Sequence, residues 1–242
     1  MMKPFIIDFQ ICNHYVSEPE LQRLIAQYQS SGQFTYDELT TFLNTVIFNA
    51  RLKLLDHSDG SFRNLCDTAQ SMIGRGLESI GIPVRILDIG AAIHEEALGH
   101  SVLIADLVCE GKPYPVLIDI TYQQFCLTEN CLDSCYIKKD GFVLMSPDPG
   151  YVAKKNPQTT EVIRRLLEYG YLPWTKEIAK NYCDTFFLSR TGREEEIEKQ
   201  SHTGEEYLAM TRKSNRGYSN SVEDLKRKGL LLFSSDQHHY QK

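Results

Sequence analysis

The sequence predicts an α+β fold in which helices pack on an antiparallel sheet. Apolar residues recur at helical spacing over most of residues 18–57 and again after residue 66. Two apolar runs, 100–108 and 114–121, are joined by a short polar stretch, an arrangement typical of a β-hairpin. A hairpin between helical segments is consistent with helices packed on an antiparallel sheet.

The first two helices are predicted from their starts and stops. Ser17 followed by Glu20 reads as a capping box, and Gly32 is expected to end that helix. Thr35 and Glu38 repeat the capping signature before a longer apolar stripe. Residues 3–11 are expected to form a short strand or an extended arm.

A third helix is expected to carry Cys66, with Ser61 or Asn64 as its N-cap. Gly74 and Gly76 each cost a helix interior about 1 kcal/mol relative to alanine. The helix therefore needs close packing or other tertiary support at these two glycines. A strand over residues 83–89 is expected to come after it.

The last helices lie beyond the hairpin. Thr160 is expected to cap a helix that Gly170 closes, and Thr175 to start the next one. We divide the chain into a domain over residues 1–190 and a polar extension over residues 191–242.

The extension carries nine acidic and nine basic residues, so the net charge of −6 belongs to the domain. Ser221 with Asp224 can cap a helix that residues 230–233 would dock onto the domain, although the extension could equally be mobile.

Composition excludes several classes of protein. A net charge of −6 with no basic stripe argues against a nucleic-acid partner. There is no apolar run long enough for a signal peptide or a membrane span. Seven irregularly spaced cysteines argue against a disulfide framework, so we expect a reducing compartment such as the cytoplasm. Export by a specialised secretion machine is compatible with these features.

Cys66 is the candidate nucleophile. A thiol reacts as its thiolate, and both a helix N-terminus and a neighbouring imidazolium stabilise that anion. The N–H groups of the first helical turn can also receive an oxyanion. The simpler interpretation is that Cys66 is one more buried cysteine of the core.

His100 and Asp119 are the candidate base and the acid that orients it. If the hairpin turn is the two residues Glu110-Gly111, Asp119 faces Val102 and lies one diagonal step from His100 on the same sheet face. A four-residue turn would move it further away. Each residue alone could equally be structural, His100 as a hydrogen-bonded histidine and Asp119 as a strand-end cap.

His94 is the rival base, but it lies in a loop with two glutamates and has no strand to hold it.

The order Cys, His, Asp on a helix and a hairpin after it resembles the transglutaminase-like branch of the papain-type cysteine enzymes. The segment LESIGIPVRIL is similar to the segment that comes after the nucleophile helix in that branch. GHSVLIADL with PVLIDITYQQF, and later LLEYGYLPWTKEIAKNYCDTFFLS, resemble bacterial deamidase toxins and effectors similar to the catalytic domain of Pasteurella toxin. The resemblance covers about residues 61–189 and is most specific over 61–125.

The resemblance implies a role for each site residue. Cys66 matches the nucleophile, His100 the base and Asp119 the orienting acid. Gln124 matches the glutamine that donates to the oxyanion, with Gln123 as the alternative donor. The sequence departs from the pattern at Ile120, where these families commonly have proline.

The implied fold is papain/transglutaminase-like, with the nucleophile helix packed on the antiparallel sheet. The implied activity is deamidation of a glutamine side chain on a partner protein, which makes the chain a candidate bacterial effector or toxin delivered into a host cytosol. A host GTP-binding protein is the partner that the resemblance suggests. The alternatives are a transglutaminase or cysteine protease of the same fold, and an inactive module that binds proteins.

No cofactor and no metal are expected for this chemistry. Cys126, Cys131 and Cys135 form a C-x4-C-x3-C cluster, with Cys109 as a possible fourth member. This spacing is looser than that of most zinc sites, so we interpret these residues as packed thiols or, under oxidation, as the source of one adventitious disulfide.

Overall fold

The structure is a computed structural model, and mixed helix and antiparallel sheet confirm the α+β class. The expected arm over residues 3–11 lies outside the part of the chain that it describes. That part consists of residues 16–58, 64–92, 99–125, 136–137, 143–144, 157–188 and 217–233.

The main sheet has four strands in the order β1-β2-β3-β6, and all neighbouring pairs are antiparallel. The sequence does not predict β6, because three residues ending in proline give almost no strand pattern. The bounds are β1 Val84–Asp88, β2 Ser101–Cys109, β3 Lys112–Ile118 and β6 Tyr171–Pro173. Two short strands, β4 (Tyr136–Ile137) and β5 (Val143–Leu144), pair with each other.

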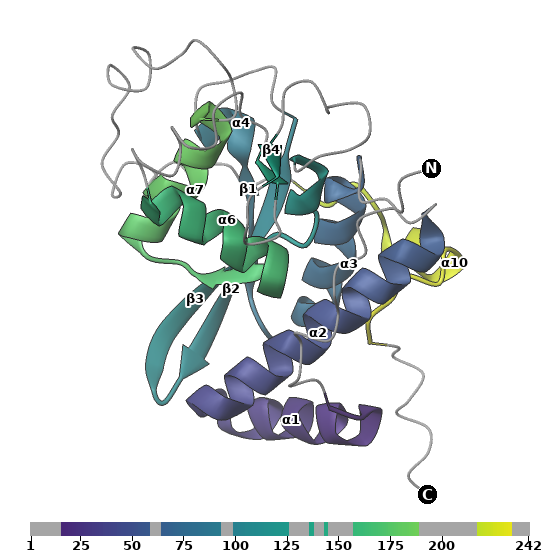
Figure 1. Ribbon diagram of the computed structural model, residues 1–242. Helices are drawn as coiled ribbons and strands as arrows, with labels where there is room; N and C mark the ends of the chain where they lie inside the picture. Colours follow the sequence, from purple (N-terminus) through teal and green to yellow (C-terminus); the bar gives the residue numbers. More distant parts are fainter. Residues whose placement is uncertain are drawn as a thin grey trace, which may run out of the picture.

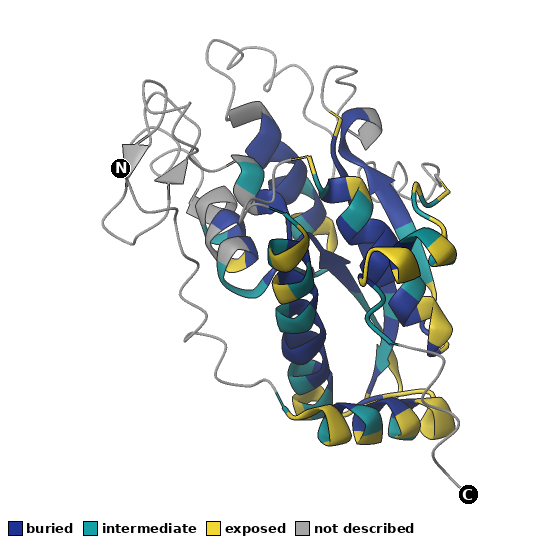
Figure 2. Cartoon of the chain, turned by 90° about the vertical axis from the view of Figure 1, so that its right-hand side faces the viewer, coloured by how far each residue is buried: buried dark blue, intermediate teal, exposed yellow. Residues whose placement is uncertain are grey.

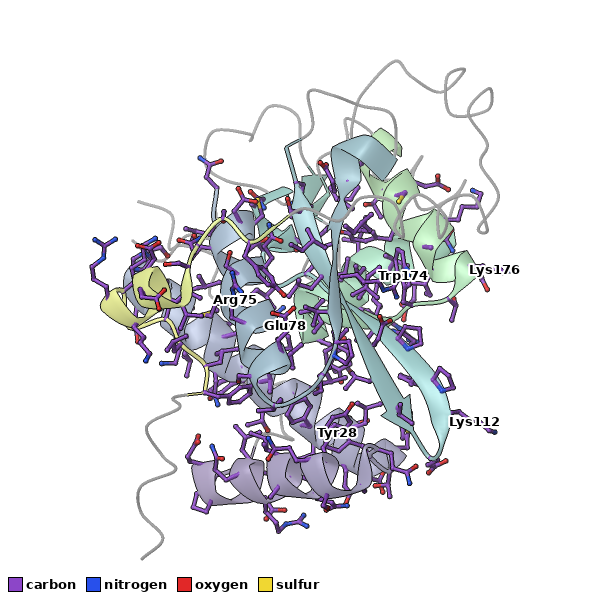
Figure 3. All side chains as sticks on the ribbon, turned by 180° about the vertical axis from the view of Figure 1, so that it is seen from behind. Tyr28, Arg75, Glu78, Lys112, Trp174 and Lys176 are labelled. Carbon is purple, nitrogen blue, oxygen red and sulfur yellow. The ribbon has the colours of Figure 1, made fainter. Side chains whose placement is uncertain are left out.

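The β2–β3 hairpin has the two-residue turn on which the position of Asp119 depends. Cys109 pairs with Lys112, and Glu110 and Gly111 between them have φ angles of 50° and 75°. Two successive positive φ angles are those of a type I′ turn, whose twist matches that of the strands. In Figure 3, Lys112 marks the tip of this hairpin.

Helices cover both faces of the sheet (Figure 1). The helices α1 (Glu18–Ser31), α2 (Tyr36–His57) and α3 (Cys66–Ser79) pack with Leu103 and Ala105 of β2 in one hydrophobic cluster. The helices α6 (Pro157–Tyr169) and α7 (Lys176–Leu188) pack with Val102 and Ile104 in a second cluster. Because neighbouring strand residues point to opposite faces, β2 contributes to both clusters, and Figure 2 shows it buried.

The helix ends confirm some of the expected caps and correct others. Thr35 and Glu38 form the capping box of α2, and Gly32 ends α1 with a φ of 71°. Ser17 is the N-cap of α1, but the expected capping box is wrong because the Ser17 side chain makes no capping bond. The Glu20 carboxylate pairs with Arg23 instead of reaching back to the cap.

The cap expected at Thr160 is also wrong, because α6 already begins at Pro157. Proline has a helical φ and lacks the N–H that the first turn leaves unbonded, so it fits a helix start. Gly170 ends this helix with a φ of 75°, as expected. Thr175 does start α7, since its hydroxyl accepts a hydrogen bond from the Ile178 N–H at 3.2 Å.

Part of the polar extension, residues 217–233, packs against α3. Ser221 and Asp224 form the expected capping box of α10 (Val222–Arg227). Leu225 and Leu230 are buried in the first hydrophobic cluster. Figure 1 shows this segment in yellow beside α3.

Gly74 and Gly76 make this packing possible. A Cβ atom at Gly74 would lie 2.5 Å from the Tyr218 ring, and one at Gly76 would lie 3.2 Å from Phe233 and Leu232. The close packing that these glycines predicted is therefore confirmed.

Two short elements lie at the end of the sheet where the candidate residues sit. The helix α4 (Ile89–Ala92) comes directly after β1, and the 3₁₀ helix η2 (Tyr122–Phe125) comes after β3. Among the helices that the structure describes, none has the length and apolar character needed to cross a bilayer.

Candidate active site

His100 and Asp119 each lie one residue beyond the regular end of a strand. Backbone bonds nevertheless continue the sheet through both residues. The His100 carbonyl accepts from the Ile89 N–H at 2.9 Å, and the Asp119 N–H donates to the Gly170 carbonyl at 2.9 Å. The sheet therefore fixes the backbone from which each side chain projects.

The side chains of His100 and Asp119 are in direct contact. His100 Nε2 lies 2.9 Å from Asp119 Oδ2, and the two residues are only 1% and 2% exposed. The register that pairs Leu103 with Ile118 places Asp119 opposite Val102, as the two-residue turn predicted. The diagonal pairing of His100 and Asp119 is confirmed.

The other carboxylate oxygen of Asp119 is bonded to Thr121. Asp119 Oδ1 accepts from the Thr121 N–H at 3.2 Å and from its hydroxyl at 3.3 Å. Asp119 thus caps the chain after β3 while its second oxygen faces the imidazole. One carboxylate therefore makes both the strand-end cap and the contact with the imidazole.

Tyr182 of α7 is a third partner of Asp119 and is not among the expected site residues. Its hydroxyl donates to Asp119 Oδ2 at 2.7 Å, the same oxygen that contacts His100. In the sequence, Tyr182 is one apolar position of a helical stripe, a pattern that indicates a core residue. The signal that could have found it is its hydroxyl, since a buried tyrosine usually needs a hydrogen-bond partner.

Cys66 is the first residue of α3, the position expected for a nucleophile at a helix start. Leu65 is the N-cap, with φ −104° and ψ 6°, and no side-chain cap bond is formed there. The cap expected at Asn64 is therefore wrong, while Ser61 lies outside the described residues. The N–H groups of the first turn are not capped by a described side chain, and Cys66 is the first residue of that turn.

The Cys66 sulfur is buried beside His100. Cys66 is 8% exposed, and its Sγ lies 3.9 Å from the Gly99 carbonyl oxygen. Cys66 is close enough to His100 to raise the pKa of the imidazole, and since Nε2 faces Asp119, Nδ1 is the nitrogen that can exchange the thiol proton. The helix start and the hairpin thus bring Cys66, His100 and Asp119 together.

The surroundings of His100 favour its charged form. Burial, the largest single influence, lowers the pKa of His100, but the charge and hydrogen bond of Asp119 together with those of Cys66 outweigh it. The balance raises the pKa from 6.5 to about 9. At neutral pH the imidazole is therefore protonated next to the sulfur, and its charge stabilises a thiolate.

Gln124 of η2 completes the group. Its Oε1 accepts from the Asn64 N–H at 3.3 Å, and its Nε2 lies 3.5 Å from His100 Nδ1. Because Asn64 holds the oxygen, the amide presents its NH₂ to the side of the site that contains the imidazole. A contact of 3.5 Å is long for a hydrogen bond, which leaves the amide protons able to bond another acceptor.

Residues 217–233 support α3 close to the nucleophile. The Ser219 hydroxyl donates to the Asp67 carbonyl at 3.2 Å, and the Asn220 N–H donates to the Ser71 hydroxyl at 3.2 Å. One turn further on, the Arg75 guanidinium lies 4.4 Å from the centre of the Tyr218 ring. Figure 3 labels Arg75 on α3.

Several candidates of the sequence lie outside the described residues: His94, the side chain of Gln123, and Cys126, Cys131 and Cys135. Cys66, Cys109 and Cys183 are free and buried. Over the described ranges, no three His, Cys, Asp or Glu side chains are grouped so that they could hold a metal ion.

Comparisons with protein-family models, curated proteins and solved structures found no match to this chain. The interpretation of the site therefore depends on its own geometry and on the resemblance of its sequence motifs. A buried thiol at a helix start, an imidazole in contact with a carboxylate, and an amide held beside them form an arrangement suited to nucleophilic catalysis at a carbonyl carbon.

Proposed function

We propose that this protein is a cysteine hydrolase of papain/transglutaminase-like architecture that deamidates a glutamine side chain on a partner protein. The observation that carries the proposal is the convergence of Cys66, His100 and Asp119, with Gln124 beside them. Glutamine is the substrate that the sequence motifs favour, because they resemble those of bacterial glutamine deamidases. The same resemblance makes an effector acting in a host cytosol, on a GTP-binding protein, the first partner to test.

Activation of the thiol gives the charged imidazole, which stands beside the sulfur at neutral pH. His100 Nε2 donates to Asp119 in either protonation state, so Nδ1 exchanges the proton with Cys66. Transfer of the thiol proton to Nδ1 leaves a thiolate at the N-terminus of α3, where the helix dipole also favours an anion. Asp119 keeps the imidazole oriented and stabilises its charge.

The thiolate attacks the carboxamide carbon of the substrate glutamine, and the carbonyl oxygen becomes an oxyanion. Its donors are the Cys66 N–H at the uncapped start of α3 and the Gln124 Nε2 group, which Asn64 holds in orientation. Donors fixed in advance stabilise the charge that develops in the transition state. Asn64 thus acts through Gln124 rather than on the substrate.

Collapse of this intermediate breaks the carbon–nitrogen bond. The imidazolium of His100 gives its Nδ1 proton to the leaving nitrogen, ammonia departs, and a thioester remains on Cys66. His100 then takes a proton from water, which attacks the thioester and releases glutamate and the free thiol. The net reaction converts glutamine and water into glutamate and ammonia.

Mass spectrometry of a protein substrate tests the proposal. The purified chain is incubated with a host-cell lysate and with purified GTP-binding protein subunits, and peptides are searched for an increase of about 1 Da at glutamine. The change should appear with the unaltered chain and be absent with Cys66→Ala. Cys109→Ala, which removes a buried thiol at the opposite end of β2 from His100, is the matched control and should keep the activity.

Other products would assign the chain differently. Cleaved peptides would identify a cysteine protease, and cross-linked glutamine or incorporated amine would identify a transglutaminase in which an amine replaces water. A Cys66→Ala variant that keeps the full biological effect, together with a Cys66 that iodoacetamide does not label selectively near pH 7, would identify an inactive binding module and overturn the proposal.

A further inference from the structure

Tyr182 contacts the same oxygen of Asp119 as His100 does, and the proposed reaction does not use this contact. Its hydroxyl and His100 Nε2 both bond to Asp119 Oδ2, at 2.7 and 2.9 Å. Tyr182 is completely buried, and its ring packs against Phe186, Trp174 and Tyr122. The phenol therefore has a fixed place and a fixed direction.

The phenol stays protonated under all ordinary conditions. Burial raises the pKa of Tyr182 well above its usual value, and the nearby Asp119 carboxylate raises it further. Tyr182 is therefore a permanent neutral donor, whereas His100 changes its charge during the reaction. Two donors of different kind share one carboxylate oxygen.

Among the described residues, few other titratable groups face His100, Asp119 and Tyr182. Asp119 is faced by His100 from the start of β2 and by Tyr182 from α7, and His100 is also faced by Cys66 from α3. Tyr182 is faced in addition by Tyr122 of η2 and by Cys183 of its own helix. Burial raises the pKa of the Cys183 thiol well above its usual value, so this thiol stays neutral.

We propose that Tyr182 is a positioning residue: its hydroxyl holds the Asp119 carboxylate toward His100 and withdraws part of the charge from Oδ2. A hydrogen bond to a carboxylate oxygen weakens the electrostatic attraction between that oxygen and a second donor. Tyr182 thus limits how strongly Asp119 stabilises the imidazolium, so that His100 can still release its proton to the leaving group. The proposal rests on the proposed function, in which His100 acts as base and acid.

The test is the NMR titration of His100, observed at its ring Cε1 proton and assigned with a His100→Asn variant. In Tyr182→Phe the carboxylate keeps more of its charge for His100, so the titration midpoint should rise by about 0.5–1 pH unit. Tyr182→3-fluorotyrosine, a stronger donor that keeps the ring and the hydroxyl, should lower the midpoint. This second variant decides the question if Tyr182→Phe does not fold.

Two controls separate this effect from loose packing. Trp174→Phe alters the ring that packs edge-on against Tyr182 but leaves the hydroxyl in place, so the midpoint should stay unchanged. In an Asp119→Asn background the effect of Tyr182→Phe should disappear, because the carboxylate through which it acts is gone. An unchanged midpoint in both Tyr182 variants, or a shift that persists without the Asp119 carboxylate, would overturn the proposal.

The titration needs no protein substrate, so its outcome is independent of whether the chain deamidates glutamine. A shifted midpoint in a chain that shows no deamidase activity would leave the role of Tyr182 intact and overturn only the proposed reaction.

Discussion

His100 Nε2 lies 2.9 Å from Asp119 Oδ2, and both side chains are almost completely excluded from water. A buried charge is costly unless it is paired and hydrogen-bonded, and this pair meets both conditions. Three elements meet around it: the ends of β2 and β3 supply the two residues, and α7 supplies Tyr182. The pair therefore links the stability of the fold to the chemistry of the site.

The stability of the fold should depend on the protonation of His100. Its pKa is 6.5 in an unfolded chain and about 9 in the folded protein, a difference that corresponds to about 3 kcal/mol. Because the folded pKa is the higher one, this stabilisation is fully present below pH 6.5 and is lost as the pH rises to 9. Urea unfolding at several pH values from 6 to 9.5 measures this pH-dependent part of the free energy of unfolding.

The control for this prediction is His100→Asn, which removes the titrating ring. This variant should be less stable at pH 6, and its stability should fall less steeply between pH 6.5 and 9 than that of the unaltered chain. Equal slopes for the two proteins would contradict the prediction.

Loss of the Gln124 amide should slow the reaction without unfolding the protein. Removing one oxyanion donor costs about 10²–10³ in rate, so Gln124→Ala should lower kcat by that factor. The measurement is ammonia release or substrate deamidation at saturating substrate. Gln22→Ala on the exposed side of α1 is the matched control. A rate equal to that of the unaltered chain would move the donor role to another residue, Gln123 being the first to test.

Gly74→Ala should destabilise the protein, although the same change in an exposed helix stabilises by about 1 kcal/mol. The added methyl group would lie 2.5 Å from the Tyr218 ring, so the ring must move. Overpacking of this kind costs about 1–3 kcal/mol. The midpoint of thermal unfolding measures it, and Tyr218→Ala in the Gly74→Ala chain should recover part of the loss by making room. A more stable Gly74→Ala protein would show that residues 217–233 do not press on α3.

Glu110→Asn should stabilise the hairpin. Glu110 has a φ of 50°, a conformation that costs most L-residues about 1–2 kcal/mol and that asparagine tolerates better. Asparagine before Gly111 also gives the preferred sequence of a type I′ turn. A rise in the thermal unfolding midpoint is expected, whereas the exchange Lys112→Arg at the neighbouring strand position should leave it unchanged. An unchanged or lower midpoint for Glu110→Asn would show that the strain is relieved elsewhere.

The contact between His100 and Asp119 could be predicted because it depends on local geometry. A two-residue turn fixes the register of both strands, and the register fixes which residues are diagonal neighbours. The packing at Gly74 and Gly76 could be predicted in the same way, since two glycines inside a helix make sense where another segment comes close. The sequence did not reveal that the segment would be residues 217–233.

Tyr182 could not be predicted as a partner of Asp119. They lie 63 residues apart, and the path between them includes β6, whose three residues carry no readable pattern. The failed caps have local causes instead. Ser17 lost its partner when Glu20 paired with Arg23, and Thr160 lies inside a helix that Pro157 starts earlier. Competing side-chain bonds and proline geometry decided both cases.

The support that residues 217–233 give to α3 has a consequence for biosynthesis. Ser71, Gly74 and Gly76 leave the ribosome long before Tyr218 and Leu230, so the flank of the helix that they occupy stays bare while the intervening chain is made. In a growing polypeptide, Cys66 therefore lies on a helix that residues 217–233 do not yet support. The packing of this segment on the helix therefore comes later than the synthesis of the helix itself, and it completes the contacts that support the start of α3.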